Sequence, residues 1–171
     1  MSNIKSSILI VEDESYIKKV LETALAAGGY RTISAVTGAQ ARSAISSYMP
    51  DMVLLDLGLP DMDGVKLLKE LRQWSAMHVI VVSARSTERD KILARDNGAD
   101  DYITKPFSAP ELLARIRAVL RRNSSGSAND DTYCVGDFNI DFNKRIVNVN
   151  NETIRLTQVE YRIVELLARN P

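Results

Sequence analysis

Residues 53–64 read VLLDLGLPDMDG, an apolar run that ends at an acid and continues into a turn-rich segment with two further acids. The apolar residues 52–55 do not alternate with polar ones, which is typical of a strand buried on both faces of a parallel sheet. Aspartate is rarely buried unless it is paired or hydrogen-bonded. Asp56 is therefore either an ordinary exposed residue at a strand end or a carboxylate with a chemical function. The other motifs of the sequence distinguish between these two interpretations.

The composition is that of an ordinary globular domain, and it excludes several classes of protein. Apolar residues make up 45% of the 171 and charged residues 26%, while 22 basic and 22 acidic residues cancel. This balance disfavours a strongly basic nucleic-acid or membrane-surface protein. Because Cys134 is the single cysteine and there is one histidine, an internal disulfide and a Cys/His zinc site are excluded. Residues 1–12 lack a signal-peptide pattern and no apolar run approaches the ~20 residues of a membrane span, so we expect a cytoplasmic protein without membrane insertion.

Strand-like runs and helical patterns alternate along residues 1–122. Three further apolar runs resemble the first, at residues 8–11, 79–82 and 102–103. Residues 17–25 carry apolar side chains at helical spacing, and Gly28-Gly29 favours a helix end. Two pairs have the spacing of capping boxes that begin further helices: Thr37 with Gln40, and Ser108 with Glu111. The alternation predicts a five-stranded, doubly wound α/β domain, in which a parallel sheet has helices on both faces.

The pattern changes after residue 122. Residues 123–131, NSSGSANDD, are too poor in apolar groups to form a core, and we interpret them as a flexible linker. Within residues 132–171, apolar and polar residues alternate at 138–142 and 147–149, Asn150-Asn151 offers a turn, and Thr157 with Glu160 forms a third capping-box spacing. About forty residues are few for an independent domain, so we expect that this second domain is truncated at Pro171.

Polar residues follow the predicted strands of the first domain at their carboxyl ends. Glu12 and Asp13 follow the first strand, Asp56 the third, Ser83 ends the fourth, and Lys105 follows the fifth. Each alone has an ordinary explanation, as a helix cap, a loop hydroxyl or a solvated charge. In an open parallel sheet, however, ligands bind outside the carboxyl ends of the strands where the strand order reverses. The shared position of these residues therefore favours a functional site.

Several motifs together resemble a known family. VEDE, LLDLGLPDMDG, VVSAR, GADDY and ITKPF, in this order and at these spacings, resemble the receiver domain of bacterial two-component response regulators, over residues 7–122. GADDYITKPFSAPELLARIRAVLRR is similar to the OmpR-type subfamily, and the segment from Tyr133 resembles the beginning of its winged-helix DNA-binding domain. LDLGLPD, LRQWS and VSARSTERDK are further similar to regulators of potassium-uptake operons. His78 stands where many relatives have proline, and Ser83 stands at a position that is usually threonine and keeps the hydroxyl.

The resemblance implies a phosphoacceptor protein rather than an enzyme, one that catalyses its own phosphorylation and dephosphorylation. Asp56 is then the nucleophile that takes a phosphoryl group from a sensor histidine kinase. Crowded carboxylates require a cation, and oxygen ligands suit Mg²⁺. The resemblance implies that Asp13 and Asp56 bind the ion directly, that the Gly58 carbonyl is a third ligand, and that Glu12 acts through water. The Lys105 ammonium would neutralise charge on the phosphoryl oxygens.

The resemblance also implies how phosphorylation is transmitted. Ser83 would donate a hydrogen bond to the phosphoryl oxygen and Tyr102 would turn inward, with a cis bond expected before Pro106. Phosphorylation would then favour a homodimer through a charged face, although such a face is ordinarily just solvated. Its predicted pairs across the twofold axis are Lys91 with Glu111, Asp101 with Arg115, and Asp100 with Arg117.

Promoter DNA is the implied target of the full-length protein. Residues 123–171 hold 5 basic and 7 acidic residues, a net charge of −2, and in the family the helix for the major groove would follow residue 170. We therefore do not expect this 171-residue chain to bind a promoter specifically.

Three other classes of protein share some of these features. A haloacid-dehalogenase phosphohydrolase needs a second aspartate two residues after the nucleophile, where this chain has Gly58. A flavodoxin-like cofactor protein would bind phosphate after the first strand, where Glu12, Asp13 and Glu14 repel it. A stand-alone receiver switch that acts through protein partners stays open, because the second domain is incomplete.

Overall fold

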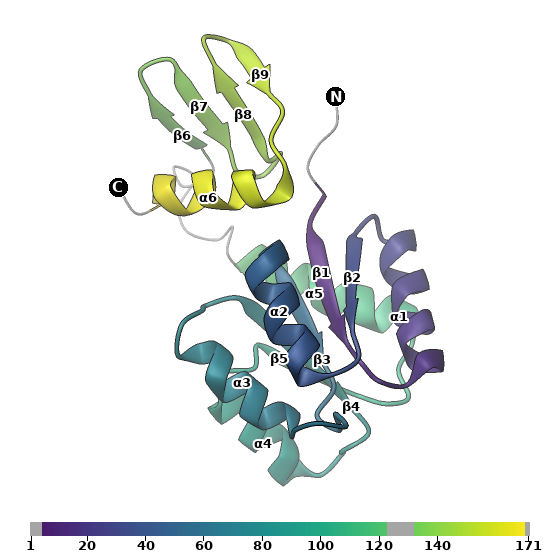
Figure 1. Cartoon of the computed structure of the whole chain (residues 1–171). Helices are drawn as coiled ribbons and strands as arrows, with labels where there is room; N and C mark the ends of the chain where they lie inside the picture. Colours follow the sequence, from purple (N-terminus) through teal and green to yellow (C-terminus); the bar gives the residue numbers. More distant parts are fainter. Residues whose placement is uncertain (1–4, 123–131, 170–171) are drawn as a thin grey trace. The chain divides into compact units, whose positions relative to one another are not determined.

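The computed structural model describes residues 5–122 and 132–169, which divide into two compact units. Ser6–Leu120 form the first unit, and residues 132–169 belong to the second (Figure 1). The predicted linker at residues 123–131 lies outside the described residues. None of the described helices is long and apolar enough to cross a membrane.

The first unit contains a five-stranded parallel sheet with the order β2-β1-β3-β4-β5. The strands are β1 (Ser7–Val11), β2 (Arg31–Ala35), β3 (Met52–Leu55), β4 (His78–Ser83) and β5 (Asp101–Thr104). β1 lies next to the edge strand β2, and the strands that follow, β3 to β5, extend the sheet on the other side of β1, so the strand order reverses beside β1. The predicted doubly wound fold is confirmed.

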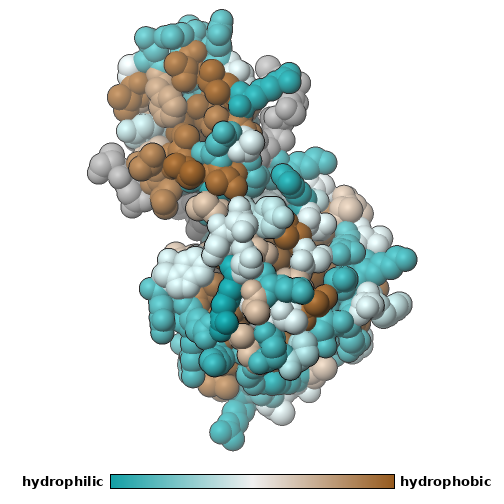
Figure 2. All heavy atoms as spheres, in the orientation of Figure 1, coloured by the Kyte–Doolittle hydropathy of each residue, from teal (hydrophilic) through white to brown (hydrophobic). Residues whose placement is uncertain are grey.

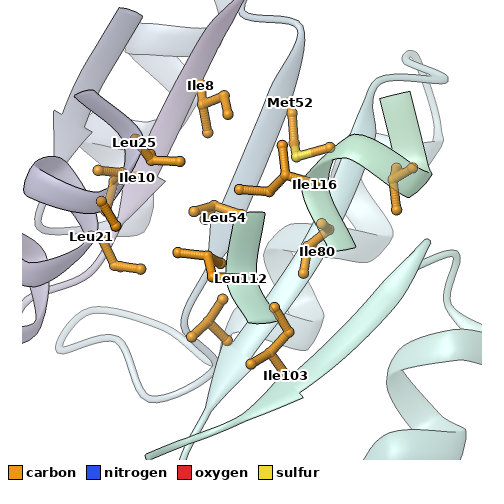
Figure 3. Packing of buried hydrophobic residues seen from close by; sticks show 13 residues of the cluster. Ile8, Ile10, Leu21, Leu25, Met52, Leu54, Ile80, Ile103, Leu112 and Ile116 are labelled. Atoms are coloured by element: carbon orange, nitrogen blue, oxygen red, sulfur yellow. The ribbon is translucent and has the colours of Figure 1, made fainter. Parts of the chain in front are cut away.

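Five helices cover the two faces of this sheet. They are α1 (Ser15–Ala27), α2 (Gly38–Tyr48), α3 (Gly64–Arg72), α4 (Glu88–Asp96) and α5 (Ala109–Arg121). Alternate residues of β1 enter opposite cores: Ile8 and Ile10 pack with α1 and α5, as Figure 3 shows for that core, while Leu9 and Val11 pack with α2 and α3. Every residue of β1 and β3 is buried, which is why these stretches of sequence do not alternate.

The predicted helix starts are formed by side-chain caps. The Thr37 hydroxyl accepts a hydrogen bond from the Gln40 N–H at 3.1 Å, and Ser108 does the same for Glu111 at 3.2 Å. The Gln40 side chain accepts from the N–H of Val36, one residue earlier than the capping box requires. Each hydroxyl satisfies a backbone N–H that the first helical turn leaves without a partner.

Residues 132–169 of the second unit form an antiparallel sheet with one helix. Its strands are β6 (Thr132–Val135), β7 (Phe138–Asp141), β8 (Ile146–Val149) and β9 (Glu152–Ile154), in sequential order, and its helix is α6 (Gln158–Arg169). Asn150 and Asn151 have φ values of 53° and 65°, as the predicted tight turn between β8 and β9 requires. Thr157 and Glu160 form a complete capping box, with bonds of 3.3 and 2.8 Å in the two directions.

The second unit has a small core and a large apolar surface. Ile140, Val147 and Tyr161 are buried together, whereas Leu166 and Leu167 on α6 are 60% and 66% exposed. Figure 2 shows the apolar side chains of this unit, in brown, over much of the face in view. The order of the elements, four antiparallel strands and then a helix, fits the beginning of a winged-helix domain, as the sequence predicts.

Candidate functional site

The topology brings the predicted site residues to one edge of the sheet. β1, β3, β4 and β5 are consecutive neighbours and parallel, so their carboxyl ends lie in a row. Glu12, Asp56 and Lys105 directly follow β1, β3 and β5, and Ser83 is the last residue of β4. The Asp56 N–H donates to the Val11 carbonyl at 2.9 Å, which extends the strand pairing as far as the carboxylate.

Three carboxylates meet at this edge. One carboxylate oxygen from each of Glu12, Asp13 and Asp56 lies within 4.8 Å of the other two. Glu12 and Asp56 are buried, with 1% and 8% exposure, while Asp13 is open to solvent. Because like charges this close repel one another, the ionised cluster requires a counter-charge. The all-oxygen donor set is the one that Mg²⁺ prefers in proteins.

Lys105 provides part of that counter-charge. Its Nζ lies 2.7 Å from Oε2 of Glu12 and 3.6 Å from Oδ2 of Asp56. Burial raises the pKa of Glu12 above its usual value in spite of the bond from Lys105. Burial alone would lower the pKa of Lys105, but the bond to Glu12 and the charge of Asp56 outweigh it and raise that pKa. Lys105 therefore keeps its positive charge at neutral pH.

The loop after Asp56 is closed by hydrogen bonds of its own backbone. The Gly58 N–H donates to Oδ1 of Asp56 at 3.3 Å, and the Gly64 N–H donates to the Leu57 carbonyl at 2.9 Å. Gly58 and Asp63 also form an isolated antiparallel bridge. A Cβ on Gly64 would lie 2.5 Å from the Asp56 carbonyl oxygen, so the glycine permits the close return of the chain.

The two other acids of this stretch are helix caps. Both carboxylate oxygens of Asp61 accept from the start of α2, with Oδ1 2.8 Å from the Gly38 nitrogen and Oδ2 3.1 Å from that of Ala39. These backbone bonds, with that from Gly38 the strongest, hold the pKa of Asp61 below its usual value. Asp63 caps α3 through Oδ1, which lies 2.8 Å from the Val65 nitrogen. Asp56 alone of the three acids in VLLDLGLPDMDG lies among the carboxylates of the site.

Ser83 and Tyr102 are both buried, and both bond the backbone of Arg85. Ser83 is 2% exposed and Tyr102 5%. The Ser83 hydroxyl accepts from the Arg85 N–H at 3.2 Å, and the Tyr102 hydroxyl donates to the Arg85 carbonyl at 2.6 Å. Burial raises the pKa of Tyr102, and a hydrogen bond with Ser83 offsets part of that rise. The sequence predicts an inward position for Tyr102 after phosphorylation, and in this structure it is already inward. The peptide bond between Lys105 and Pro106 is cis, as expected.

Arg85 is the last residue of the VVSAR motif, but the sequence did not indicate its contacts in this region. Its guanidinium donates to Oδ2 of Asp63 at 3.1 Å and to the Leu57 carbonyl at 3.4 Å. Both acceptors lie more than twenty positions earlier in the chain, so no local pattern could have pointed to them.

The residues of the predicted dimer face make contacts within one chain. The Arg115 guanidinium lies 3.0 Å from Asp101 and 3.3 Å from Glu111. Asp100 accepts from the Val79 N–H at 2.8 Å and from Arg72 at 3.3 Å. Two further residues of the face are placed by their helices: Lys91 on α4 is half-buried, and Arg117 on α5 is exposed. The predicted pairs between two copies stay a prediction, and in the single chain Asp101 is already the partner of Arg115.

Comparison with known proteins gives a family and close relatives. Residues 8–117 match the response regulator receiver domain family, a range that contains every residue of the site. The chain is 45% identical over 165 residues to the KDP operon transcriptional regulatory protein KdpE of Escherichia coli (strain K12), covering 96% of this chain and 73% of that protein. It is 42% identical over 167 residues to KdpE of Staphylococcus aureus, covering 98% of this chain and 72% of that protein.

Solved structures agree with these relatives. DrrB of Thermotoga maritima, described as an OmpR/PhoB homolog, superposes with a TM-score of 0.65 at 28% identity, over 98% of this chain and 74% of DrrB. The BeF3-activated receiver domain of RstA from Klebsiella pneumoniae superposes with a TM-score of 0.66 at 31% identity, over 68% of this chain and 99% of that one.

Proposed function

The chain belongs to the response regulators, as a KdpE-like member of the OmpR type, and from this premise we propose that Asp56 receives a phosphoryl group from a sensor histidine kinase. The observation that carries the proposal is the position of the Asp56 carboxylate, buried at the end of β3 with the Lys105 ammonium 3.6 Å from Oδ2. A nucleophile beside a fixed positive charge is what transfer of a negatively charged group requires.

The transfer needs little from the protein beyond position and charge. An Asp56 oxygen attacks the phosphorus, the bond from phosphorus to the kinase histidine nitrogen breaks, and an aspartyl phosphate forms. Lys105 stays protonated, because its pKa is raised, and offsets charge on the phosphoryl oxygens. The Gly58 N–H, which donates to Oδ1 of Asp56, orients the carboxylate for the attack.

A magnesium ion fits the donor set at this site. Asp13 and Asp56 would hold it directly, together with the Gly58 carbonyl, and Glu12 would act through water. The fit is supported by three carboxylates that each place one oxygen within 4.8 Å of the other two and by the exposure of Asp13, which leaves the cluster open to solvent. When bound, the ion supplies the positive charge that the carboxylates and the phosphoryl oxygens share.

Phosphorylation acts on the rest of the protein through Ser83 and Tyr102. The Ser83 hydroxyl donates to the new phosphoryl oxygen, and Tyr102 occupies the space behind it. Both side chains are buried and both bond the backbone of Arg85, which supports their role as a coupled pair. The change then favours a homodimer through α4, β5 and α5, the elements that carry the charged face.

We propose that the full-length protein is cytoplasmic and regulates transcription of a potassium-uptake operon by binding its promoter, whereas the 171-residue chain is not expected to bind a promoter specifically. We assign residues 1–122 to the receiver and 132–171 to the beginning of the DNA-binding domain. The match to transcriptional regulators extends through the second unit and covers 96% of the chain, which favours this output over a stand-alone switch that acts through protein partners.

The experiment that tests the site is phosphoryl labelling with acetyl phosphate and Mg²⁺. Asp56→Asn keeps the shape of the side chain and removes the nucleophile, so acid-stable, base-labile label should disappear. Asp61→Asn is the matched control, because it changes a carboxylate of the same loop that caps α2. Normal labelling of Asp56→Asn, or equal loss in Asp61→Asn, would refute the assignment.

A further inference from the structure

We propose that Arg85 is the positioning residue of the switch, and that its guanidinium holds Ser83 and Tyr102 inward by tying the β4–α4 loop to the loop after Asp56. The inference rests on the proposed function, because it presumes that Ser83 and Tyr102 respond to the phosphoryl group. It adds a residue outside the acids, the lysine and the two hydroxyls to which that function is assigned.

The backbone of Arg85 contacts both members of the switch. Its N–H donates to the Ser83 hydroxyl at 3.2 Å, and its carbonyl accepts from the Tyr102 hydroxyl at 2.6 Å. A serine hydroxyl has one proton to donate and two lone pairs that accept. With an N–H bound to one lone pair, the Ser83 proton stays available for another acceptor. The position of this one peptide segment therefore sets both hydroxyls at once.

The side chain of Arg85 fixes that peptide segment to a second loop. One nitrogen of the guanidinium lies 3.1 Å from Oδ2 of Asp63, and the other lies 3.4 Å from the carbonyl of Leu57, the residue after Asp56. The Leu57 carbonyl also accepts from the Gly64 N–H, so the loop is closed at the point where Arg85 binds. A planar guanidinium with two acceptors holds an orientation as well as a distance.

The two oxygens of Asp63 have separate partners. Oδ1 accepts from the Val65 N–H and caps α3, while Oδ2 accepts from Arg85. Asp63→Asn can therefore retain the cap through Oδ1 and replace the ionised partner of Arg85 with an amide. This separation allows the ion pair to be removed from either side without loss of the helix start.

An exposed ion pair contributes little free energy, but a small contribution is sufficient to change the populations of the inward and outward orientations of Tyr102. For Tyr102 to turn outward, its hydroxyl must leave the Arg85 carbonyl, which the guanidinium keeps in place. The loss of one exposed pair should change the ratio of inward to outward Tyr102 by about two- to fivefold.

The test is ¹⁹F NMR of the full chain with 3-fluorotyrosine at its 6 tyrosines, with Tyr102→Phe to assign the resonance. Arg85→Met and Asp63→Asn are the two variants that remove the pair. The matched control is Arg42→Met, because Arg42 forms another exposed pair, with Glu70 at 2.6 Å, between α2 and α3. Labelling of Asp56 is measured on the same samples.

We expect the Tyr102 resonance to move toward the solvent-exposed position in both variants, by the same amount, and no further when Arg85→Met and Asp63→Asn are combined. Arg42→Met should leave it unchanged. An unmoved Tyr102 resonance in Arg85→Met, additive shifts, or an equal shift in Arg42→Met would overturn the inference. Label on Asp56 separates the two proposals: its absence in the parent chain would refute the proposed function, whereas an unmoved resonance with normal labelling refutes only the role of Arg85.

Discussion

Replacement of Gly64 by alanine is expected to destabilise the first unit, although alanine is the better helix former. The new Cβ would lie 2.5 Å from the Asp56 carbonyl oxygen and 2.7 Å from the Leu57 Cα, and neither backbone atom can rotate away as a side chain would. Overpacking of this kind costs about 1–3 kcal/mol. Gly64 is the first residue of α3, so the helix preference of alanine, which applies to the helix interior, offsets little of that cost. The free energy of unfolding should therefore fall by about 1–3 kcal/mol.

Urea denaturation followed by the fluorescence of Trp74 measures this change, because the only tryptophan of the sequence lies in the first unit. The midpoint should fall at unchanged m-value, and labelling of Asp56 should fall with it because its carbonyl is displaced. Gly58→Ala is the matched control, since its Cβ would meet no atom closer than Oδ2 of Asp56 at 3.9 Å. If Gly64→Ala were as stable as the parent, or Gly58→Ala as destabilised, the close approach at Gly64 would not be what the fold requires.

Three further predictions concern the metal, the pH dependence and the dimer. Asp13→Asn should weaken Mg²⁺ binding in calorimetric titration, because a charged ligand is lost, and an unchanged affinity would remove Asp13 from the site. Burial alone would raise the pKa of Asp100, but the His78 ring, whose Nδ1 lies 3.7 Å from Oδ1, the bond from the Val79 N–H and the charge of Arg72 outweigh burial and lower that pKa below its usual value of 3.8. The free energy of unfolding that Asp100 contributes is thus present above pH 3.8 and is lost as the pH falls through its lower folded-state pKa. In Asp100→Asn, the free energy of unfolding should therefore decrease less steeply as the pH falls below 3.8. Arg115→Glu should prevent dimerisation with beryllofluoride and Mg²⁺ in sedimentation while labelling persists, and a variant that still dimerises would exclude this residue from the interface.

The fold was predictable where burial of a strand produces a recognisable pattern of apolar residues. β1 and β3 are buried on both faces and read as unbroken apolar runs, whereas β2, RTISA, is an edge strand with a mixed pattern that did not identify it by residue. The acids and Lys105 were predictable for a related reason. A parallel sheet collects its strand ends at one edge, so their position in sequence relative to the strands was sufficient.

Other features depend on contacts between loops, which local sequence does not encode. Asp61 and Asp63 were visible as acids, yet their roles as caps of α2 and α3 follow only from the path of the loop. The pairing of Arg85 with Asp63 joins positions 22 residues apart. Likewise Arg115 was identified as a charge available to a second copy, but a carboxylate of its own chain, Asp101, lies within 3.0 Å.

The closed loop from Leu57 to Gly64 has a thermodynamic consequence for whatever arrives at Asp56. Ordering a residue of an open loop costs roughly 1–2 kcal/mol in conformational entropy. In this loop the residues become ordered when the chain folds, so the entropy is lost on folding and not on binding. A cation or a phosphoryl donor then finds its partners in place and need not supply binding energy to arrange them. We therefore expect a donor as small as acetyl phosphate, which offers few contacts beyond its charge, to be a sufficient substrate. The heat capacity change on Mg²⁺ binding should be correspondingly small, because the cation is not expected to drive further burial of apolar surface.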